Sequence, residues 1–500
     1  MHPSNSKASL EDGRRISVRK SRAASMIQDE TLHSIPELDV VAASSSFKLP
    51  KNIWPLIPVL IYMFLAALAP SIVDPTLPGI RKAYFGDSTK AALWSGIFES
   101  FFSFVGLFTG GMFGRLSDAQ GRWPVLGLVT FLVTIPLALH CIFLETNAWP
   151  FLATQSVVYA FGSTPMGSPA MGFAMISDLF EPFERLVPLS LFMTAFFLGM
   201  SGSSIPSLFK WDNQQIAITG VCLAISIQIF IFFGLKESLP VEKRKRVQMK
   251  ELFQNPLAPL KFLFTSRYLR AFTALNFCLN FPFYIVMSIN LYYLQSRIEG
   301  FGTTSDNAML LTSSGVSYIV LSYTAVPMGL KLLSPPTMIC IAACVAIFNN
   351  AFYFVVWEKW QVFAFLGPAA GMSLCTVPIV IQLVTSTLKP NEQGIALGTM
   401  AAVKGLASAV GPILGAAAYS LGTNQLGFSA LPYSLSLSVS IVGLLVALFV
   451  VRPLIKELER SPATCTLSTV NADDDLSDVA NVQSDTDRAH LLTKEDGRSE

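Results

Sequence analysis

The sequence predicts an all-α integral membrane protein with twelve transmembrane helices in two six-helix halves and with both termini in the cytosol. Three observations predict this fold: an apolar composition, twelve long apolar segments, and basic residues gathered on one side of those segments. The chain has 500 residues, of which 52% are hydrophobic and 14% are charged. A soluble domain has about 25% charged residues. Because this chain cannot cover itself with water-facing side chains, its natural solvent is a bilayer.

Twelve segments are long and apolar enough to cross a membrane, which takes about 20 predominantly apolar residues. A polar stretch, 236–269, separates the first six from the second six. Segments 187–208 and 394–420 are rich in Gly, Ser and Ala, the small residues through which membrane helices approach closely. The predicted spans are 54–78, 91–113, 124–144, 150–176, 187–208, 215–235, 270–294, 307–330, 336–356, 361–386, 394–420 and 431–451.

The distribution of Lys and Arg indicates the orientation, because these residues are enriched in cytosolic loops. With both termini in the cytosol, the inside loops hold 14 Lys and Arg and the outside loops hold 6. The predicted domains are a disordered N-terminal tail (1–50), an N-terminal six-helix half (51–235), a cytosolic central loop (236–269), a C-terminal six-helix half (270–452) and a disordered acidic tail (453–500).

Glycine and proline recur at matching places in the two halves. The fifth span has Gly199 and Pro206, and the eleventh has Gly405 and Pro412, also seven residues apart. Together with Gly411, these residues are predicted helix-packing positions. The offset of 206 residues between the two pairs predicts parallel repeats, an architecture in which transporters place their substrate site between the halves.

A nine-residue segment follows the second span and reads Gly-Arg-Leu-Ser-Asp-Ala-Gln-Gly-Arg over residues 114–122. It resembles the Gly-x-Leu-x-Asp-x-x-Gly-Arg signature of the major facilitator superfamily, in its expected place between spans two and three. Residues 236–240 and 392–394 resemble the hippocampus abundant transcript-like and tetracycline-antiporter branch. The resemblance covers about 54–452, and it implies twelve helices, alternating access by rocking of the two halves and, often, proton coupling.

Physically, the signature describes a tight cytosolic turn that can act as a conformational gate. Gly114 and Gly121 permit close helix approach and a positive φ. We expect Asp118 to pair with Arg122 and to lie at a helix N-terminus, where the helix dipole favours an anion. The equivalent segment of the second half, 329–331, lacks the Asp and the Gly-Arg pair.

Three charged residues, Asp74, Glu99 and Lys404, lie well inside apolar spans. A charge in mid-membrane costs roughly 3 to 17 kcal/mol, so each must face protein or water and is a candidate for proton coupling or ion pairing. Asp74 lies about 30 Å above the cytosolic start of its span, so a capping role at the membrane rim is the alternative. We expect Glu99 and Lys404 to pair across the two halves. Otherwise, Glu99 is neutral and bonded locally while Lys404 faces the cavity.

Four amide side chains are candidates for the substrate cavity. The family fold implies that spans one, four, seven and ten surround this cavity, and amides on these spans can bind a polar substrate. The alternative is hydrogen bonding between helices, at about 0.6 kcal/mol each. The candidates are Gln155, Asn276, Asn280 and Gln382.

These observations predict a secondary transporter of a small organic solute, with protons as a possible second partner. The alternative is a receptor or scaffold that kept the fold and lost transport. No phosphate-binding GxxxxGK[ST] loop is present for ATP, and we expect no catalytic residue, metal or cofactor. A net charge of only +2 does not predict a basic surface that would bind nucleic acid. We expect a monomer. The tail segment 487–492 resembles an acidic-dileucine signal for sorting adaptors, which favours endolysosomal or vacuolar membranes, with the plasma membrane as the alternative.

Overall fold

The computed structural model describes residues 52–143, 152, 157, 168–180, 185–244, 260–261, 263, 267–324, 328, 332–374, 380 and 390–460. These residues belong to the second of two units of the chain, residues 49–500. All regular secondary structure within them is helical. The predicted all-α class is therefore confirmed for the part of the chain that the structure describes.

The first span is longer than the sequence predicts. Helix α2 (Leu56–Val73) continues through the 3-10 turn η2 (Asp74–Thr76) into α3 (Leu77–Phe85). Pro75 and Pro78 occupy the first turns of η2 and α3, where proline is tolerated, whereas Pro70 lies inside α2. The segment ends at Gly86, which has a φ of +77° that glycine adopts without strain.

The remaining helices of the first half follow in short succession. Gly121, with a φ of +106°, is the single residue between α4 and α5. Helix α10 begins with a capping box formed by Asp212 and Gln215. These elements are α4 (Ser88–Gln120), α5 (Arg122–Phe143), α7 (Ser168–Leu179), α8 (Leu186–Ser201), η5 (Gly202–Ser204), α9 (Ile205–Leu208), α10 (Asn213–Gly234) and η6 (Val241–Lys243).

The second half contains similar helices with more local irregularity. A capping box of Thr303 and Asp306 begins α14, and three short π-helical segments widen the helices that they interrupt. The elements are α12 (Arg267–Met287), α13 (Asn290–Arg297), α14 (Thr304–Tyr323), α16 (Pro335–Phe352), α17 (Lys359–Gln361), η8 (Val362–Leu366), α18 (Gly367–Leu374), α20 (Pro390–Leu421), η9 (Gly422–Leu426), α21 (Leu431–Val446), η10 (Ala447–Val451) and α22 (Arg452–Arg460).

Eight helical segments of the described residues are long and apolar enough to cross a membrane, by length and composition. They coincide with eight of the predicted spans. The spans predicted at 307–330 and 336–356 correspond to α14, which is less apolar, and to α16, which is shorter. Those predicted at 150–176 and 361–386 lie partly outside the described residues. The count of twelve and the cytosolic termini stay predictions.

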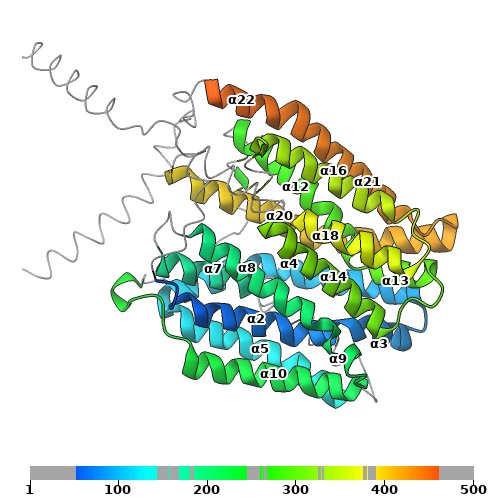
Figure 1. Cartoon of the computed structure of the whole chain (residues 1–500), viewed down its shortest axis with the longest axis horizontal. Coiled ribbons are helices and arrows are strands. Elements are labelled where there is room, and N and C mark those ends of the chain that lie inside the picture. The colour runs from blue at the N-terminus through cyan, green and yellow to red at the C-terminus, as the bar shows by residue number, and fades with distance from the viewer. Residues whose placement is uncertain are drawn as a thin grey trace, which may run out of the picture. The chain divides into compact units, whose positions relative to one another are not determined.

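The helices form two groups that follow the order of the chain. Elements before residue 235 lie in the lower part of Figure 1, and elements after residue 267 lie mostly in the upper part. In the first group, α2 lies at the centre of a core that includes Tyr62, Leu126 of α5, Phe192 of α8 and Ile227 of α10. Large aromatic side chains also face outward, such as Phe233 at 81% exposure. Lipid rather than water is the natural surrounding of such a surface.

The two ends of the helix bundle are named here by their turns. The motif end carries the turn from α4 to α5 at Gly121. The far end carries the turns at Gly86 and Gly300, both of which have a positive φ. The turn η2 and helix α14 meet at the far end, where the Asn307 amide donates to the Pro75 carbonyl at 3.0 Å.

Candidate functional site

At the motif end, Arg122 lies at the centre of a network of charges. Its guanidinium forms an ion pair with Asp118, which lies four residues earlier, at the end of α4. It also donates to Asp178 at 3.0 Å and to the Ser117 hydroxyl at 2.7 Å. The Arg122 side chain is 10% exposed, so the carboxylates offset a charge that water reaches poorly. The predicted pairing of Asp118 with Arg122 is confirmed.

The expectation that Asp118 lies at a helix N-terminus is wrong. Asp118 belongs to the last turn of α4, because that helix continues to Gln120. The carboxylate at the start of α5 is instead that of Glu237, which accepts the backbone N–H groups of Arg122 at 2.9 Å and Trp123 at 3.2 Å. Glu237 thus satisfies two of the free donors of the first turn, and it also pairs with Arg244 at 3.5 Å.

The two glycines of the motif differ in their surroundings. A Cβ atom on Gly121 would overlap the carboxylate of Glu237, and the φ of this residue is strained for any other side chain. Among the described residues, and apart from the helix backbone and its chain neighbours, none has an atom within 4 Å of where the Cβ of Gly114 would be. The close helix approach expected at Gly114 is therefore not formed in this structure.

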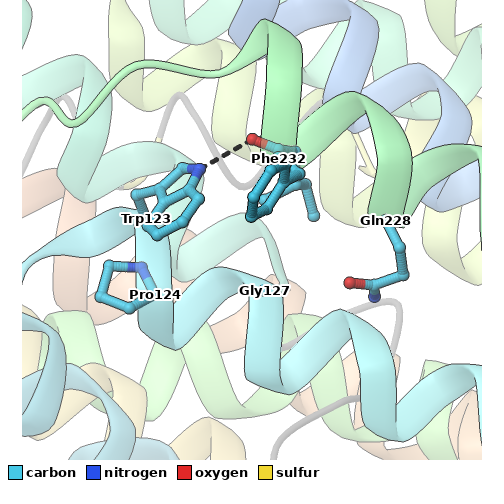
Figure 2. A pocket seen from close by; sticks show the side chains of 6 residues that line it. Trp123, Pro124, Gly127, Gln228 and Phe232 are labelled. Carbon is cyan, nitrogen blue, oxygen red and sulfur yellow. Dashed lines mark hydrogen bonds between the residues drawn. The ribbon is translucent and has the colours of Figure 1, made fainter.

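A cavity of about 260 Å³ lies beside this network. Figure 2 shows the indole of Trp123 at its edge and the side chain of Gln228 across from it. The Trp123 indole N–H donates to the carbonyl of Ile231 at 2.7 Å, which joins α5 to α10. Both helices belong to the first half, so this cavity is separate from the predicted substrate cavity between the halves. Its lining residues are Trp123, Pro124, Gly127, Gln228, Ile231 and Phe232.

The predicted packing glycines lie at close helix contacts. Gly199 of α8 lies against the backbone carbonyl of Phe64, Gly405 of α20 against Leu107 of α4, and Gly411 of α20 against Tyr284 of α12. A methyl group at any of these positions would force its neighbour to move. Two of the three contacts are with helices of the same half, and the Gly405 contact joins the two halves.

The two predicted prolines differ in their contacts. Pro412 offers its carbonyl to the Ser288 hydroxyl at 3.2 Å and lies against Gly96 of α4. Pro206 is buried in α9, and its carbonyl accepts the Trp211 N–H at 2.9 Å.

Two seams join the halves. The first seam is α4 against α20, where Gly96 lies against Ala416 and the Ser100 hydroxyl accepts the Ile413 N–H at 3.0 Å. The second seam is α8 and η5 against α14. Its hydrogen bonds run from Ser203 to the Ala308 carbonyl (3.1 Å), from Thr312 to the Ser201 carbonyl (2.9 Å) and between Thr194 and Tyr323 (2.6 Å), and Phe197 stacks on Tyr318.

A second charge cluster lies at the far end. Arg81 of α3 is 3.9 Å from Glu99 of α4 and donates to the Ser95 hydroxyl at 2.9 Å. The Ser95 hydroxyl is also 2.9 Å from the hydroxyl of Tyr292, which belongs to α13 in the other half. Asp74 of η2 contributes a second carboxylate that interacts with Arg81. Two of the three predicted charged candidates, Asp74 and Glu99, thus interact with the same arginine.

The predicted Glu99–Lys404 pair is not formed in this structure, and this prediction is corrected. Among the described residues the ion partner of Glu99 is Arg81, and the structure holds no ion pair between Glu99 and Lys404. The reason is the register of the first seam. Ser100 lies at the level of Ile413, so Lys404 lies nine residues, or about 13 Å, further along α20.

The predicted cavity amides give a divided result. Gln155 and Gln382 lie outside the described residues. Asn276 and Asn280 lie on α12, one turn apart, and the Asn280 amide donates to both the side chain (3.0 Å) and the backbone carbonyl (2.8 Å) of Asn276. In this structure these two amides therefore hydrogen-bond within their own helix.

The described helices form two apolar groups that contact each other along two seams of small residues. Buried charged side chains lie at both ends of the bundle. This arrangement is that of a multi-pass membrane protein with two halves. The family model described as "Major Facilitator Superfamily" matches residues 59–305. Residues 59–305 therefore match this superfamily, in agreement with the resemblance drawn from residues 114–122. The solved structures of similar fold include transporters.

Similar proteins support this assignment. Hippocampus abundant transcript-like protein 1 of Bos taurus is 23% identical over 330 residues, which are 64% of this chain and 63% of the relative, so the match spans less than two thirds of that protein. Major facilitator superfamily domain-containing protein 10 of Homo sapiens is 24% identical over 68% of this chain and 76% of its own. Among solved structures, the human organic anion transporter MFSD10 (TETRAN) has a TM-score of 0.60 at 20% identity and covers 80% of this chain and 100% of its own. The nucleoside transporter NupG has a TM-score of 0.61 at 15% identity, over 79% and 98%. At these identities the structures are similar in fold.

Proposed function

We propose that the protein is a secondary transporter that moves a small organic solute by alternating access. The observation that carries this proposal is the set of direct bonds between the halves at the far end. Asn307 with Pro75, Ser203 with Ala308, and Ser95 with Tyr292 each join one half to the other. These bonds must break if the far end opens, so they describe one closed state of a gate.

The arrangement in the membrane follows from the distribution of basic residues. We propose twelve transmembrane helices, with the motif end and both tails (1–50 and 453–500) in the cytosol and the far end on the opposite side. The central segment 236–269 then connects the halves on the cytosolic side. Its residue Glu237 caps α5 beside Arg122, which supports the boundary proposed at 235.

Organic anions are the first substrates to test, because one solved relative of this fold is an organic anion transporter. Purified protein in liposomes should accumulate a labelled organic anion faster than empty liposomes do. Repeating the measurement with an imposed pH gradient tests proton coupling. A panel of solutes that raise the melting temperature would identify binders by mass action.

A receptor or scaffold that kept this fold is the second candidate. The observation that favours it is the second-half segment 329–331, which lacks the Asp and Gly-Arg of the motif. Solutes that stabilise the protein but show no uptake into liposomes would favour this function over transport.

Asp118→Asn tests whether the motif acts as a gate. We expect uptake to fall while the amount of protein in the membrane stays near that of the wild type. The Asp118 side chain is 37% exposed, so its ion pair contributes at most about 1 kcal/mol to stability. Quantitative blotting of the membrane fraction is measured beside uptake. Wild-type uptake in this variant would reduce the motif to a marker of topology.

The dileucine segment of the C-terminal tail tests the location. We propose that Leu491 and Leu492 direct the protein, through sorting adaptors, to endolysosomal or vacuolar membranes. Replacing both by alanine should move a fluorescently tagged protein to the plasma membrane. If the location stays the same, the segment is not a sorting signal in this chain.

A further inference from the structure

Lys404 is a cation inside an apolar helix, and it has no ion partner in the part of the chain that the structure describes. Its side chain is half-buried in α20. An ammonium group in such a place is strongly unfavourable unless something pairs with it. The predicted spans that lie partly outside the described residues, 150–176 and 361–386, contain no Asp or Glu that could do so.

The neighbouring helix α4 provides no carboxylate at the level of Lys404 either. Leu107 of α4 lies against Gly405, the residue next to Lys404. Asp118 is eleven residues from Leu107 toward the motif end, or about 16 Å along the helix axis. Glu99 is eight residues from Leu107 toward the far end, or about 12 Å. Lys404 therefore lies between two carboxylates that are both out of its reach.

Helix α12 faces Lys404 from the same half. Lys404 precedes Gly411 by two helical turns, so the two residues share one face of α20, and Gly411 lies against Tyr284 of α12. Both helices run from the motif end to the far end. Phe277 precedes Tyr284 by two turns, which places it at the level of Lys404. Helix α12 contains no Asp or Glu.

The side chains of α12 at this level supply hydrogen-bond donors. Thr273 and Asn276 are 3% and 6% exposed. The Thr273 hydroxyl is buried and has no hydrogen-bond partner among the described residues, which is rare for a buried polar group. The Asn276 oxygen already accepts from Asn280 at 3.0 Å, so its N–H groups are what it can still offer. Because long side chains on a helix point back toward its N-terminus, the Lys404 ammonium extends toward the level of Thr273.

An apolar surface lies next to these donors. The ring of Phe277 is partly buried and stacks on Phe281, with ring centroids 4.7 Å apart and planes at 20°. A ligand that satisfies both features has an acceptor-rich, negatively charged group and an apolar or aromatic body. Since Lys404 carries one positive charge, a monovalent carboxylate balances it, whereas a dianion would leave an excess negative charge in the membrane.

We infer that Lys404, Thr273 and Asn276 bind the carboxylate of an organic anion whose apolar body lies against Phe277. The ammonium of Lys404 supplies the charge, and the Thr273 hydroxyl donates a hydrogen bond. This inference names the substrate class of the proposed transport function, and it rests on that function in treating the anion as cargo. Because Gly405 joins α20 to the other half, the anion binds close to the first seam.

The test measures binding to the purified protein in detergent, without transport. The probe is benzoate, and benzamide is its neutral analogue of nearly the same shape. Benzoate should raise the melting temperature with its concentration, because a ligand of the folded state stabilises it by mass action. Benzamide should not. The affinity for benzoate should fall at least about tenfold in Lys404→Gln and roughly tenfold in Thr273→Val, since each variant removes a charge-assisted hydrogen bond.

Three further variants separate a binding role of Lys404 from a structural one. Without any anion, Lys404→Met should melt at a higher temperature than the wild type, because it removes a charge that has no partner. Lys404→Arg keeps the charge and should keep part of the benzoate affinity. Lys90→Gln removes an exposed cation at the far end, and it should leave the melting temperature and the benzoate affinity unchanged.

No shift with benzoate, equal shifts with benzoate and benzamide, or wild-type affinity in Lys404→Gln would overturn the inference. Uptake of labelled benzoate into liposomes is measured separately on the same preparations. Binding that depends on Lys404 without uptake supports the anion site and counts against transport. Uptake that does not depend on Lys404 supports transport and overturns the site.

Discussion

Replacing Arg122 by alanine should destabilise the protein by about 3–5 kcal/mol, the usual loss when one partner of a buried ion pair is removed. Asp178 would be left without its main partner, since it now accepts from Arg122 at 3.0 Å and from Ser238 at 3.2 Å. Asp118 would lose its ion pair as well. The loss is measured as a fall in the melting temperature of the purified protein in detergent.

The matched control for this variant is Lys236→Ala. Lys236 is also a cation at the motif end and directly precedes Glu237, but its side chain is exposed. Its replacement should change stability by less than about 0.5 kcal/mol. If Arg122→Ala and Lys236→Ala melt at the same temperature, the network around Arg122 does not stabilise this fold.

Gly96→Ala should impair closure of the far end. A Cβ atom at Gly96 would lie 2.5 Å from the Cβ of Ala416 and 2.6 Å from the carbonyl oxygen of Pro412. Because a helix backbone cannot move aside as a flexible side chain does, α4 and α20 must separate. Overpacking of this kind costs about 1–3 kcal/mol, which shifts a two-state equilibrium by roughly 5- to 150-fold. Uptake of the solute should fall accordingly. The distance between spin labels at the exposed far-end positions Lys90 and Glu299, one in each half, should increase.

Gly110→Ala provides the control within the same helix. It makes the same chemical change in α4, but in the part of the chain that the structure describes nothing outside the helix backbone lies within 4 Å of the added atom. Because alanine favours a helix by up to about 1 kcal/mol over glycine, this variant should be as stable as the wild type or slightly more stable. Equal uptake by Gly96→Ala and Gly110→Ala would show that the first seam tolerates an added methyl group.

The sequence predicts local features of the site better than distant ones. Asp118 and Arg122 are only four residues apart, on either side of the turn at Gly121, so their pairing depends on the local turn that the motif predicts. Asp178 and Glu237 are 56 and 115 residues away from Arg122, and only tertiary folding brings them near. Glu237 belongs to residues 236–240, which resemble the family sequence at this place, whereas no local pattern indicates Asp178.

Arg81 and Lys404 show two other limits of sequence reasoning. Arg81 follows the predicted first span, 54–78, so the sequence places it in a loop, but the helix continues to Phe85 and Arg81 is buried. The Glu99–Lys404 prediction required the register of α4 against α20. Helix α4 extends to Gln120 rather than to residue 113, which places Glu99 further from Lys404 than the apolar segments suggested.

The two seams restrict how the halves can move. Each seam is a line of contact between antiparallel helices, and two rigid bodies that touch along two lines cannot turn about either line without separating at the other. Sliding would move Gly96, Gly315 and Gly405 away from the neighbours that only glycine accommodates. The rotation that remains is about an axis that crosses both seams, which opens one end of the bundle as it closes the other. If the proposed transport function holds, the two seams of the described residues would leave one main motion, in which the state of one end determines the state of the other.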